Sequence, residues 1–152
     1  AENIIVMDAG KIVQVGSPAE LFDRPKTTFV GYFIGAPAMN FFECQASGGN
    51  KLSIGSAEIM TGTDLSKVGS APLKLGIRSE YIRIVEAKGA NTFTAQVQRV
   101  EDMGNYKLVT AVFEGHVIKV KVERDIAVPA DRVELQLPAE NCCVYAADIL
   151  VS

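Results

Sequence analysis

The chain has 152 residues, of which 48% are hydrophobic, so it is long enough for one modest domain with an appendage. Its net charge of −3 and its lack of tryptophan argue against nucleic-acid binding, which needs basic surfaces for phosphates and aromatic platforms for bases. No apolar run approaches the ~20 residues of a membrane-spanning helix, and no signal-like segment opens the chain.

The first elements in chain order are predicted to form a short β-hairpin. Residues 4–7 and 11–15 are apolar runs, and the turn between them contains Gly10, which tolerates the positive φ of a tight turn. A two-stranded hairpin is only marginally stable by itself in water. We therefore expect residues 1–36 to be the last part of a larger domain whose main body lies upstream.

Two short helices are predicted after the hairpin. Residues 17–20, Ser-Pro-Ala-Glu, form a capping box with proline in the first helical turn, and Pro25 ends this helix. Residues 28–34 form a second helix that ends before Gly35. The second helix is apolar on more than one face. We expect it to pack on the β-strand domain that follows or on a second copy of the chain, with exchange of the N-terminal segment as one route to the latter.

From residue 37 onward the sequence alternates between apolar and polar residues, which is typical of strands with one buried face. Glu114-Gly115 is the predicted tip of a tight hairpin. Seven or eight short, regularly spaced strands favour a small antiparallel barrel or sandwich. The expected strands are residues 40–45, 73–78, 93–98, 108–113, 117–122, 133–137 and 142–146, with shorter candidates at 51–54 and 57–60.

No group of residues predicts catalysis or metal binding. The sequence lacks the Gly-x-x-x-x-Gly-Lys-Ser/Thr loop that holds nucleotide phosphates, so we expect no ATP site within it. Glu101 and Asp102 are adjacent and would diverge on a strand, and Asp125 and Asp131 lie near turns, so these carboxylates are expected to be solvated. His116 is expected to be exposed at a hairpin tip, and no ligand spacing indicates zinc.

The three cysteines form no disulfide framework. Cys44, Cys142 and Cys143 are odd in number and irregularly spaced, which favours reduced thiols that act as small hydrophobic residues. On a strand Cys142 and Cys143 would point to opposite faces, so we expect one in the core and one exposed.

Several segments resemble a known family. Residues 4–35 are similar to the end of the ATP-binding subunit of importer-type ABC transporters, and Leu-Gly-Ile-Arg-Ser-Glu at residues 75–80 resembles the Leu-Gly-Ile-Arg-Pro-Glu motif of its regulatory domain. Pro-Ala-Met-Asn-Phe at residues 37–41 is similar to the sugar branch, which includes the maltose and glycerol-3-phosphate importers. Two departures are Ser79, where the family usually has proline, and Tyr81, where it usually has histidine.

The resemblance implies two parts, the C-terminal tail of a nucleotide-binding domain at residues 1–36 and a TOBE/MOP-like regulatory barrel at residues 37–152. The implied fold is mainly β, a small OB-like/MOP-like antiparallel β-barrel preceded by a β-hairpin and two short helices. The parent subunit would use ATP and Mg, form a homodimer through the barrel, and energise import of a sugar or related solute with membrane permease subunits. It would be cytoplasmic and peripheral on the inner face of the membrane, within reach of a regulatory protein. The present chain by itself would be no enzyme and would hold no cofactor.

The resemblance points to structural and interface residues rather than catalytic ones. Arg78 and Glu80 either face a partner or shape a turn through a salt bridge or a carbonyl-capping arginine, and we favour the structural role. The full set is Phe33, Gly35, Met39, Asn40, Phe41, Leu75, Gly76, Ile77, Arg78 and Glu80.

A different class of function is a sensor for a small oxyanion or a sugar phosphate. Related barrels in oxyanion importers bind anions such as molybdate between subunits. Ser66-Lys67 with Gly69-Ser70 supplies hydroxyl, backbone and cationic groups of the kind such a site uses.

Overall fold

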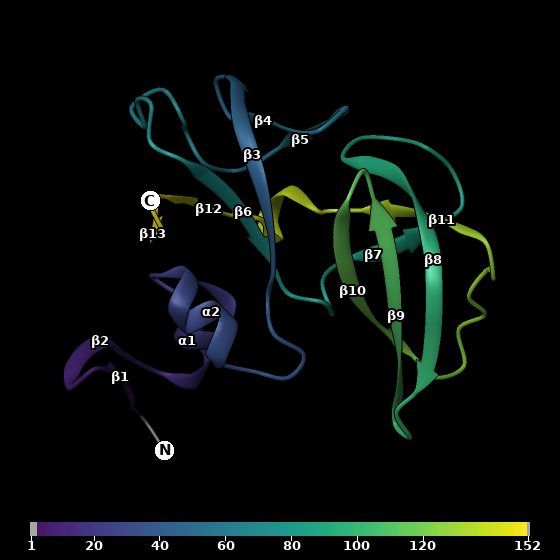
Figure 1. Ribbon diagram of the computed structural model, residues 1–152, viewed down its shortest axis with the longest axis horizontal. Helices are drawn as coiled ribbons and strands as arrows, with labels where there is room; N and C mark the ends of the chain where they lie inside the picture. The colour runs from purple at the N-terminus through teal and green to yellow at the C-terminus, as the bar shows by residue number, and fades with distance from the viewer. Residues whose placement is uncertain (1–2, 152) are drawn as a thin grey trace.

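The structure is a computed structural model that describes residues 3–151. It begins with a hairpin of β1 (Ile4–Asp8) and β2 (Lys11–Gly16), followed by α1 (Pro18–Asp23) and α2 (Thr28–Phe33). The predicted capping box is present, because Ser17 accepts the N–H of Glu20 while the Glu20 carboxylate approaches the Ser17 N–H. Figure 1 shows this hairpin and helix pair at one end of the molecule, beside two curled sheets.

The rest of the chain is mainly β, as expected, and forms two antiparallel sheets. One sheet has the strand order β13-β12-β6-β3-β4-β5 and the other has the order β10-β9-β8-β11-β7. The bounds are β3 (Asn40–Gly48), β4 (Lys51–Ile54), β5 (Ala57–Met60), β6 (Leu73–Ile77), β7 (Arg83–Val85), β8 (Thr92–Asp102), β9 (Tyr106–Phe113), β10 (His116–Glu123), β11 (Arg132–Gln136), β12 (Cys143–Ala146) and β13 (Ile149–Leu150), with a 3-10 turn η1 (Ala139–Asn141) before β12.

The two sheets repeat the same four-strand arrangement. The order β5-β4-β3-β6 in one corresponds to β10-β9-β8-β11 in the other. The next strand along the chain joins the opposite sheet in each case. After β3–β6, β7 pairs with β11, and after β8–β11, β12 pairs with β6. We refer to residues 40–85 as the first unit and to residues 91–146 as the second unit.

The register makes the repeat residue-specific. A β-bulge follows Ala46 in β3 and Val97 in β8, and each of these residues lies six positions after an asparagine, Asn40 or Asn91. The sequences Leu-Gly-Ile-Arg-Ser-Glu at 75–80 and Leu-Gln-Leu-Pro-Ala-Glu at 135–140 occupy equivalent positions at the end of β6 and of β11. This repeat was not among the features predicted from the sequence.

Equivalent asparagines join the two sheets. The Asn40 amide accepts the Lys119 N–H and donates to the Lys119 carbonyl, both at 2.9 Å. The Asn91 amide does the same with the N–H and carbonyl of Met60, both at 2.8 Å. An unpaired strand edge exposes such backbone groups, so each asparagine closes the edge of the opposite sheet. These side chains therefore join the two curled sheets at their edges.

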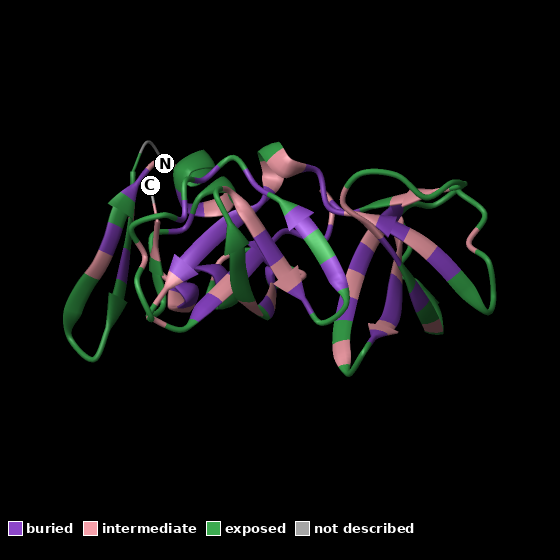
Figure 2. Cartoon of the chain, turned by 90° about the horizontal axis from the view of Figure 1, so that it is seen from above, coloured by how far each residue is buried: buried purple, intermediate pink, exposed green. Residues whose placement is uncertain are grey.

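A single hydrophobic core lies between the sheets and draws residues from both units. Inward and outward side chains alternate along the strands, which Figure 2 shows as bands of buried and exposed residues. Glu114-Gly115 is the tip of the β9–β10 hairpin, as predicted. His116, however, is half-buried rather than exposed, because its ring lies 5.8 Å from that of Phe42.

Candidate functional site

Arg78 joins the barrel to the N-terminal helices. It follows β6 and is fully buried. Its Nε donates to the Phe22 carbonyl at 2.7 Å, and its Nη1 donates to the carbonyls of Ile34 at 2.5 Å and Gly31 at 3.4 Å. Carbonyls in the last turn of a helix lack partners within the helix and carry a partial negative charge. Arg78 therefore caps the ends of both helices from the barrel side.

The residues around Arg78 fix the position of its guanidinium group. Its guanidinium carbon lies 4.2 Å from the centroid of the Phe22 ring, a cation–π geometry. Gly35 has φ +91°, and a Cβ there would lie 2.8 Å from that ring and 3.0 Å from Arg78 Nη1. Burial lowers the pKa of Arg78 and the nearby Glu80 opposes that shift. The site thus combines a carbonyl-capping arginine with a glycine that leaves room for it.

A surface ion pair between Arg78 and Glu80 was one of our structural alternatives, and the structure differs from it. Among residues 3–151 the two side chains form no salt bridge, while Arg78 Nη2 and Glu80 Oε1 are buried without a hydrogen-bond partner. The reason is that the helix ends cover Arg78 and supply neutral carbonyl acceptors in place of a carboxylate.

Two tyrosines attach the end of α1 to the same face. Tyr81 donates its hydroxyl hydrogen bond to Asp23 Oδ1 at 2.6 Å, which with partial burial raises the pKa of Tyr81 to about 12. The Tyr145 hydroxyl donates to the Pro25 carbonyl at 2.7 Å, and burial raises the pKa of Tyr145 well above its usual range. Neither tyrosine was among the expected site residues. Because these contacts span 58 and 120 positions of sequence, no local pattern indicates them.

An aromatic seam continues the contact towards α2. Phe41 packs against Tyr32, with ring centroids 4.5 Å apart, and against Tyr145 at 5.5 Å. Gly76 lies beneath, where a Cβ would come within 2.9 Å of Met39, Phe41 and Tyr145. The second helix therefore packs on the barrel, the first of the two arrangements expected for it.

The ten expected residues fall into distinct environments. Arg78, Gly35, Met39, Phe41 and Gly76 meet at the junction, with Glu80 close by. Asn40 closes a sheet edge, Leu75 and Ile77 belong to the core, and Phe33 projects from α2 with 72% of its surface exposed.

Both adjacent cysteines are buried, which corrects our expectation that one is exposed. Cys142 lies in the barrel core and Cys143 lies on the opposite face, where the N-terminal segment covers it. Burial raises the pKa of the Cys142 thiol to about 12 and that of the Cys44 thiol to about 12. These thiols therefore stay protonated near neutral pH.

The residues suggested for anion binding do not converge. Gly69 and Ser70 line an open groove that also contains Lys74, but Ser66 and Lys67 lie outside it. Lys74 forms a salt bridge with Asp148 at 3.2 Å. The groove thus offers hydroxyl and backbone groups but no uncommitted cation.

The acidic residues behave as surface groups. Glu101 pairs with Arg99 and Asp102 pairs with Arg124, all of them exposed. Within residues 3–151 no three acidic, histidine or cysteine side chains gather in a way that fits a metal ion. The helices of this same part of the chain are too short to cross a bilayer.

Comparison with known proteins supports the resemblance noted from sequence. Residues 75–144 match the family model of the TOBE domain. The chain is 31% identical over 156 aligned positions to an sn-glycerol-3-phosphate import ATP-binding protein of Chromobacterium violaceum, covering 97% of this chain and 40% of that protein. It is 37% identical over 110 positions to a xylose/arabinose import ATP-binding protein of Haloferax volcanii, covering 71% of this chain and 29% of that protein. The chain thus spans about 40% of the length of the first of these relatives.

The fold also has a solved counterpart. The structure resembles that of ModG, a cytoplasmic molybdate-binding protein, with a TM-score of 0.52 at 14% identity, covering 75% of this chain and 99% of ModG. At this identity the likeness concerns the fold, which is mainly β and OB-like.

Proposed function

Because the chain belongs to the TOBE-domain family and matches the C-terminal part of sugar-importer ATP-binding subunits, we propose that it couples an ATPase core to a regulatory barrel. In this proposal residues 1–36 are the end of the nucleotide-binding domain and residues 37–152 are the regulatory domain. The observation that carries it is the Arg78 junction, where one buried guanidinium from the barrel holds the ends of both N-terminal helices.

The proposed purpose of the barrel is to keep two ATPase cores close together and in a fixed orientation. A tethered pair of weakly associating modules has a high effective concentration, provided that the connection is not too loose. The Arg78 junction supports such a role because it replaces a flexible linker by buried hydrogen bonds. The homodimer would therefore form through the barrel.

ATP chemistry is proposed to lie outside this chain. The sequence contains no phosphate-binding loop, so this chain alone would neither bind nor hydrolyse ATP. ATP and Mg would act in the nucleotide-binding core of the full-length subunit. That subunit would contact membrane permease subunits, lie on the inner face of the cell membrane, and energise import of a sugar or related solute. A regulatory protein would reach it through the barrel.

A second candidate is a sensor of a small oxyanion or sugar phosphate. The observation in its favour is the likeness to ModG, together with the position of Gly69 and Ser70 in an open groove. The charge of the groove weighs against it, because Lys74 is already paired with Asp148. Anion binding usually relies on a charged donor in addition to neutral hydrogen bonds.

One experiment separates these functions. The chain would be heated with ATP, molybdate, sulfate, sn-glycerol 3-phosphate or xylose, while its mass in solution is measured by analytical ultracentrifugation. A ligand present at about a hundred times its Kd stabilises by about 2.7 kcal/mol, which shifts Tm by several degrees. Dimer formation with no shift supports the coupling role. A Tm shift with one anion or sugar phosphate supports the sensor function. A Tm shift with ATP contradicts the proposal that this chain has no ATP site.

A further inference from the structure

One edge of the first unit is open where the equivalent edge of the second unit is closed. In the second unit the Val97 N–H donates to the Asp131 carbonyl at 2.9 Å, which extends the β8–β11 ladder by one bond. The equivalent residues of the first unit are Ala46 and Ala71. Among residues 3–151 no backbone hydrogen bond joins this pair.

The direction of the Ala46 backbone groups follows from the repeat. Backbone N–H and C=O groups alternate between the two edges of a strand, and both strands have their bulge at the same place. Since Val97 points its N–H towards β11, Ala46 points its own towards β6 and the segment that precedes it. Pro72, at the place of Arg132 in the second unit, directs its carbonyl away from β3 and accepts the Ala147 N–H at 3.0 Å. The paired residues of the first ladder end at Cys44–Leu73.

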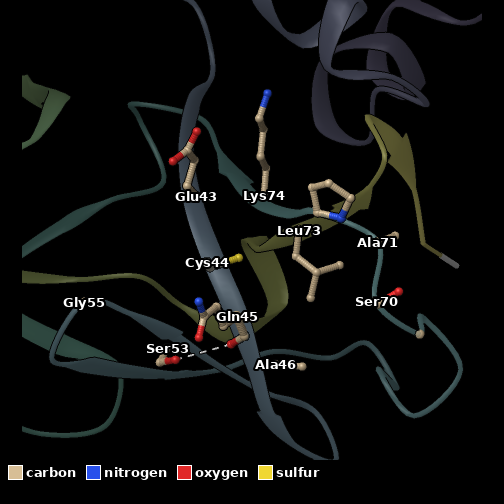
Figure 3. Close-up of a pocket in the computed structure, with 12 residues that line it drawn as sticks. Glu43, Cys44, Gln45, Ala46, Ser53, Gly55, Ser70, Ala71, Leu73 and Lys74 are labelled. Atoms are coloured by element: carbon tan, nitrogen blue, oxygen red, sulfur yellow. Dashed lines mark hydrogen bonds between the residues drawn. The ribbon is translucent and has the colours of Figure 1, made fainter.

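A groove of about 780 Å³ lies between the parted segments and is open to solvent. Figure 3 shows Ala46 on β3 at one side and Ser70 and Ala71 on the facing loop. The polar side chains along the groove are Glu43, Gln45, Ser53, Ser70 and Lys74. Their mixture of donors and acceptors, next to unpaired backbone groups, matches what an extended polypeptide presents.

We propose that this groove binds an extended peptide segment of a partner protein, which adds as a strand to the open edge of β3 at Ala46. Strand addition obtains affinity from backbone hydrogen bonds and specificity from alternate side chains. Pockets of about 300–1,000 Å³ commonly hold drug-sized ligands, so the groove has room for a short peptide segment. Glu43 forms no ion pair within residues 3–151, so it favours a basic side chain in the segment.

Two other occupants fit less well. An anion would find only Lys74, which Asp148 neutralises. A free sugar would find none of the aromatic side chains that commonly line small-molecule pockets. The inference rests on the internal repeat and is independent of the transporter role proposed above.

Hydrogen exchange tests the open edge first. Val97 and Ala46 occupy equivalent positions, so their backbone amides form an internal pair of probe and control. We expect the Ala46 amide to exchange at least about tenfold faster than that of Val97, because only the latter is bonded. Equal protection of the two amides would show a closed ladder and overturn the proposal.

A peptide titration then tests strand addition. The probe is acetyl-Ala-Asp-Arg-Val-Glu-amide, the sequence of residues 130–134, which contains the residue that closes the equivalent edge and the expected basic side chain. We expect saturable amide shifts at Ala46, Ala71 and their neighbours at about 1 mM, a Kd typical of short, weakly ordered ligands. The matched control is the same peptide with its backbone nitrogens methylated, which keeps its side chains but cannot pair.

The outcomes separate cleanly. Shifts with the probe but not with the methylated peptide support strand addition. No shift, or equal shifts with both peptides, overturns it. Shifts at Ala46 that instead grow with protein concentration, together with a dimer in sedimentation, would assign the edge to a second copy and also overturn it. Replacing Glu43 by Gln should weaken binding of the probe by about threefold if the basic side chain lies beside it, as for an exposed ion pair.

Discussion

The two units of the barrel share a strand order, a bulge and an asparagine clamp (Asn40 or Asn91), yet they differ at an equivalent position shortly after the fourth strand. The first unit has Arg78 there and the second has Pro138. The first unit consequently receives the ends of two helices, while the equivalent face of the second carries only an open depression of about 250 Å³. The same arrangement of strands therefore supports one face that binds two helices and another that stays open to solvent. The strand arrangement does not by itself decide whether helices bind.

The residue at the base of each face also differs between the two units. Gly76 lets Met39, Phe41 and Tyr145 approach closely in the first unit. The equivalent Gln136 keeps a polar side chain directed at Ala90, with a hydrogen bond of 3.4 Å to its carbonyl. The face of the first unit therefore packs against other parts of the chain, whereas the face of the second unit is polar and solvated.

The largest effect should come from removing the junction cation. Arg78→Met would remove the donor to the Phe22 and Ile34 carbonyls at the helix ends, so we expect a loss of about 3 kcal/mol or more in the free energy of unfolding. The measurement is urea unfolding. The matched control is Arg83→Met on the second face, where the arginine is exposed and the change should stay within about 0.5 kcal/mol. Equal losses of stability in the two variants would show that the Arg78 face contributes no more to stability than the equivalent face of the second unit.

The second test changes the residue at the base of each face. Gly76→Ala places a methyl group 2.9 Å from three side chains, so we expect a loss of about 2 kcal/mol and partial release of the N-terminal segment. Limited proteolysis would report that release as faster cleavage before residue 36. Gln136→Ala at the equivalent position should be nearly neutral. A neutral Gly76→Ala variant would mean that the aromatic seam shifts easily and does not fix the helices.

The asparagine clamps should behave alike if the repeat is real. Asn40→Asp and Asn91→Asp each lose a donor to a strand-edge carbonyl, and each should cost about 1–2 kcal/mol in thermal or urea unfolding. Asn40 should be the more sensitive because it is the more buried. Asn141→Asp serves as the control, since the Asn141 side chain makes no hydrogen bond within residues 3–151. A cost at only one clamp would show that a single unit closes the barrel.

The smallest expected effect concerns Tyr81. Its hydrogen bond to Asp23 raises the pKa of Tyr81 to about 12, whereas an unfolded tyrosine ionises near 10. The stabilisation from this phenol is therefore fully present below about pH 10 and is lost as pH rises towards 12. In urea unfolding, the loss of stability between pH 9 and pH 11 should be smaller in Tyr81→Phe than in the unchanged protein, by under about 1 kcal/mol. Tyr145 and the buried thiols contribute the rest of the loss in both proteins. Phenolate absorbance with every tyrosine ionising near pH 10 would contradict the hydrogen bond.

Much of the fold could be predicted from sequence because local rules govern it. The capping box at residues 17–20, the hairpin tip at Glu114-Gly115 and the alternation of the strands each depend on neighbours within a few positions. The two-residue strand β13 was not predicted, because it is too short for any alternation to be visible. The repeat was missed although the segments 75–80 and 135–140 share leucine and glutamate at matching positions, and a comparison of the chain with itself offers that signal.

The sequence by itself determined the class of fold and the family, and it indicated some of the residues around the junction, since these depend on periodicity and on a motif read along the chain. Only the tertiary structure decided what those residues do. Arg78 was expected near a turn, but its partners are carbonyls 44 to 56 positions away, and the partner of Asn40 is 79 positions away. Such contacts arise when the sheets close on each other and on the helices. Neither the closing geometry nor the burial it imposes is encoded in any short stretch of residues.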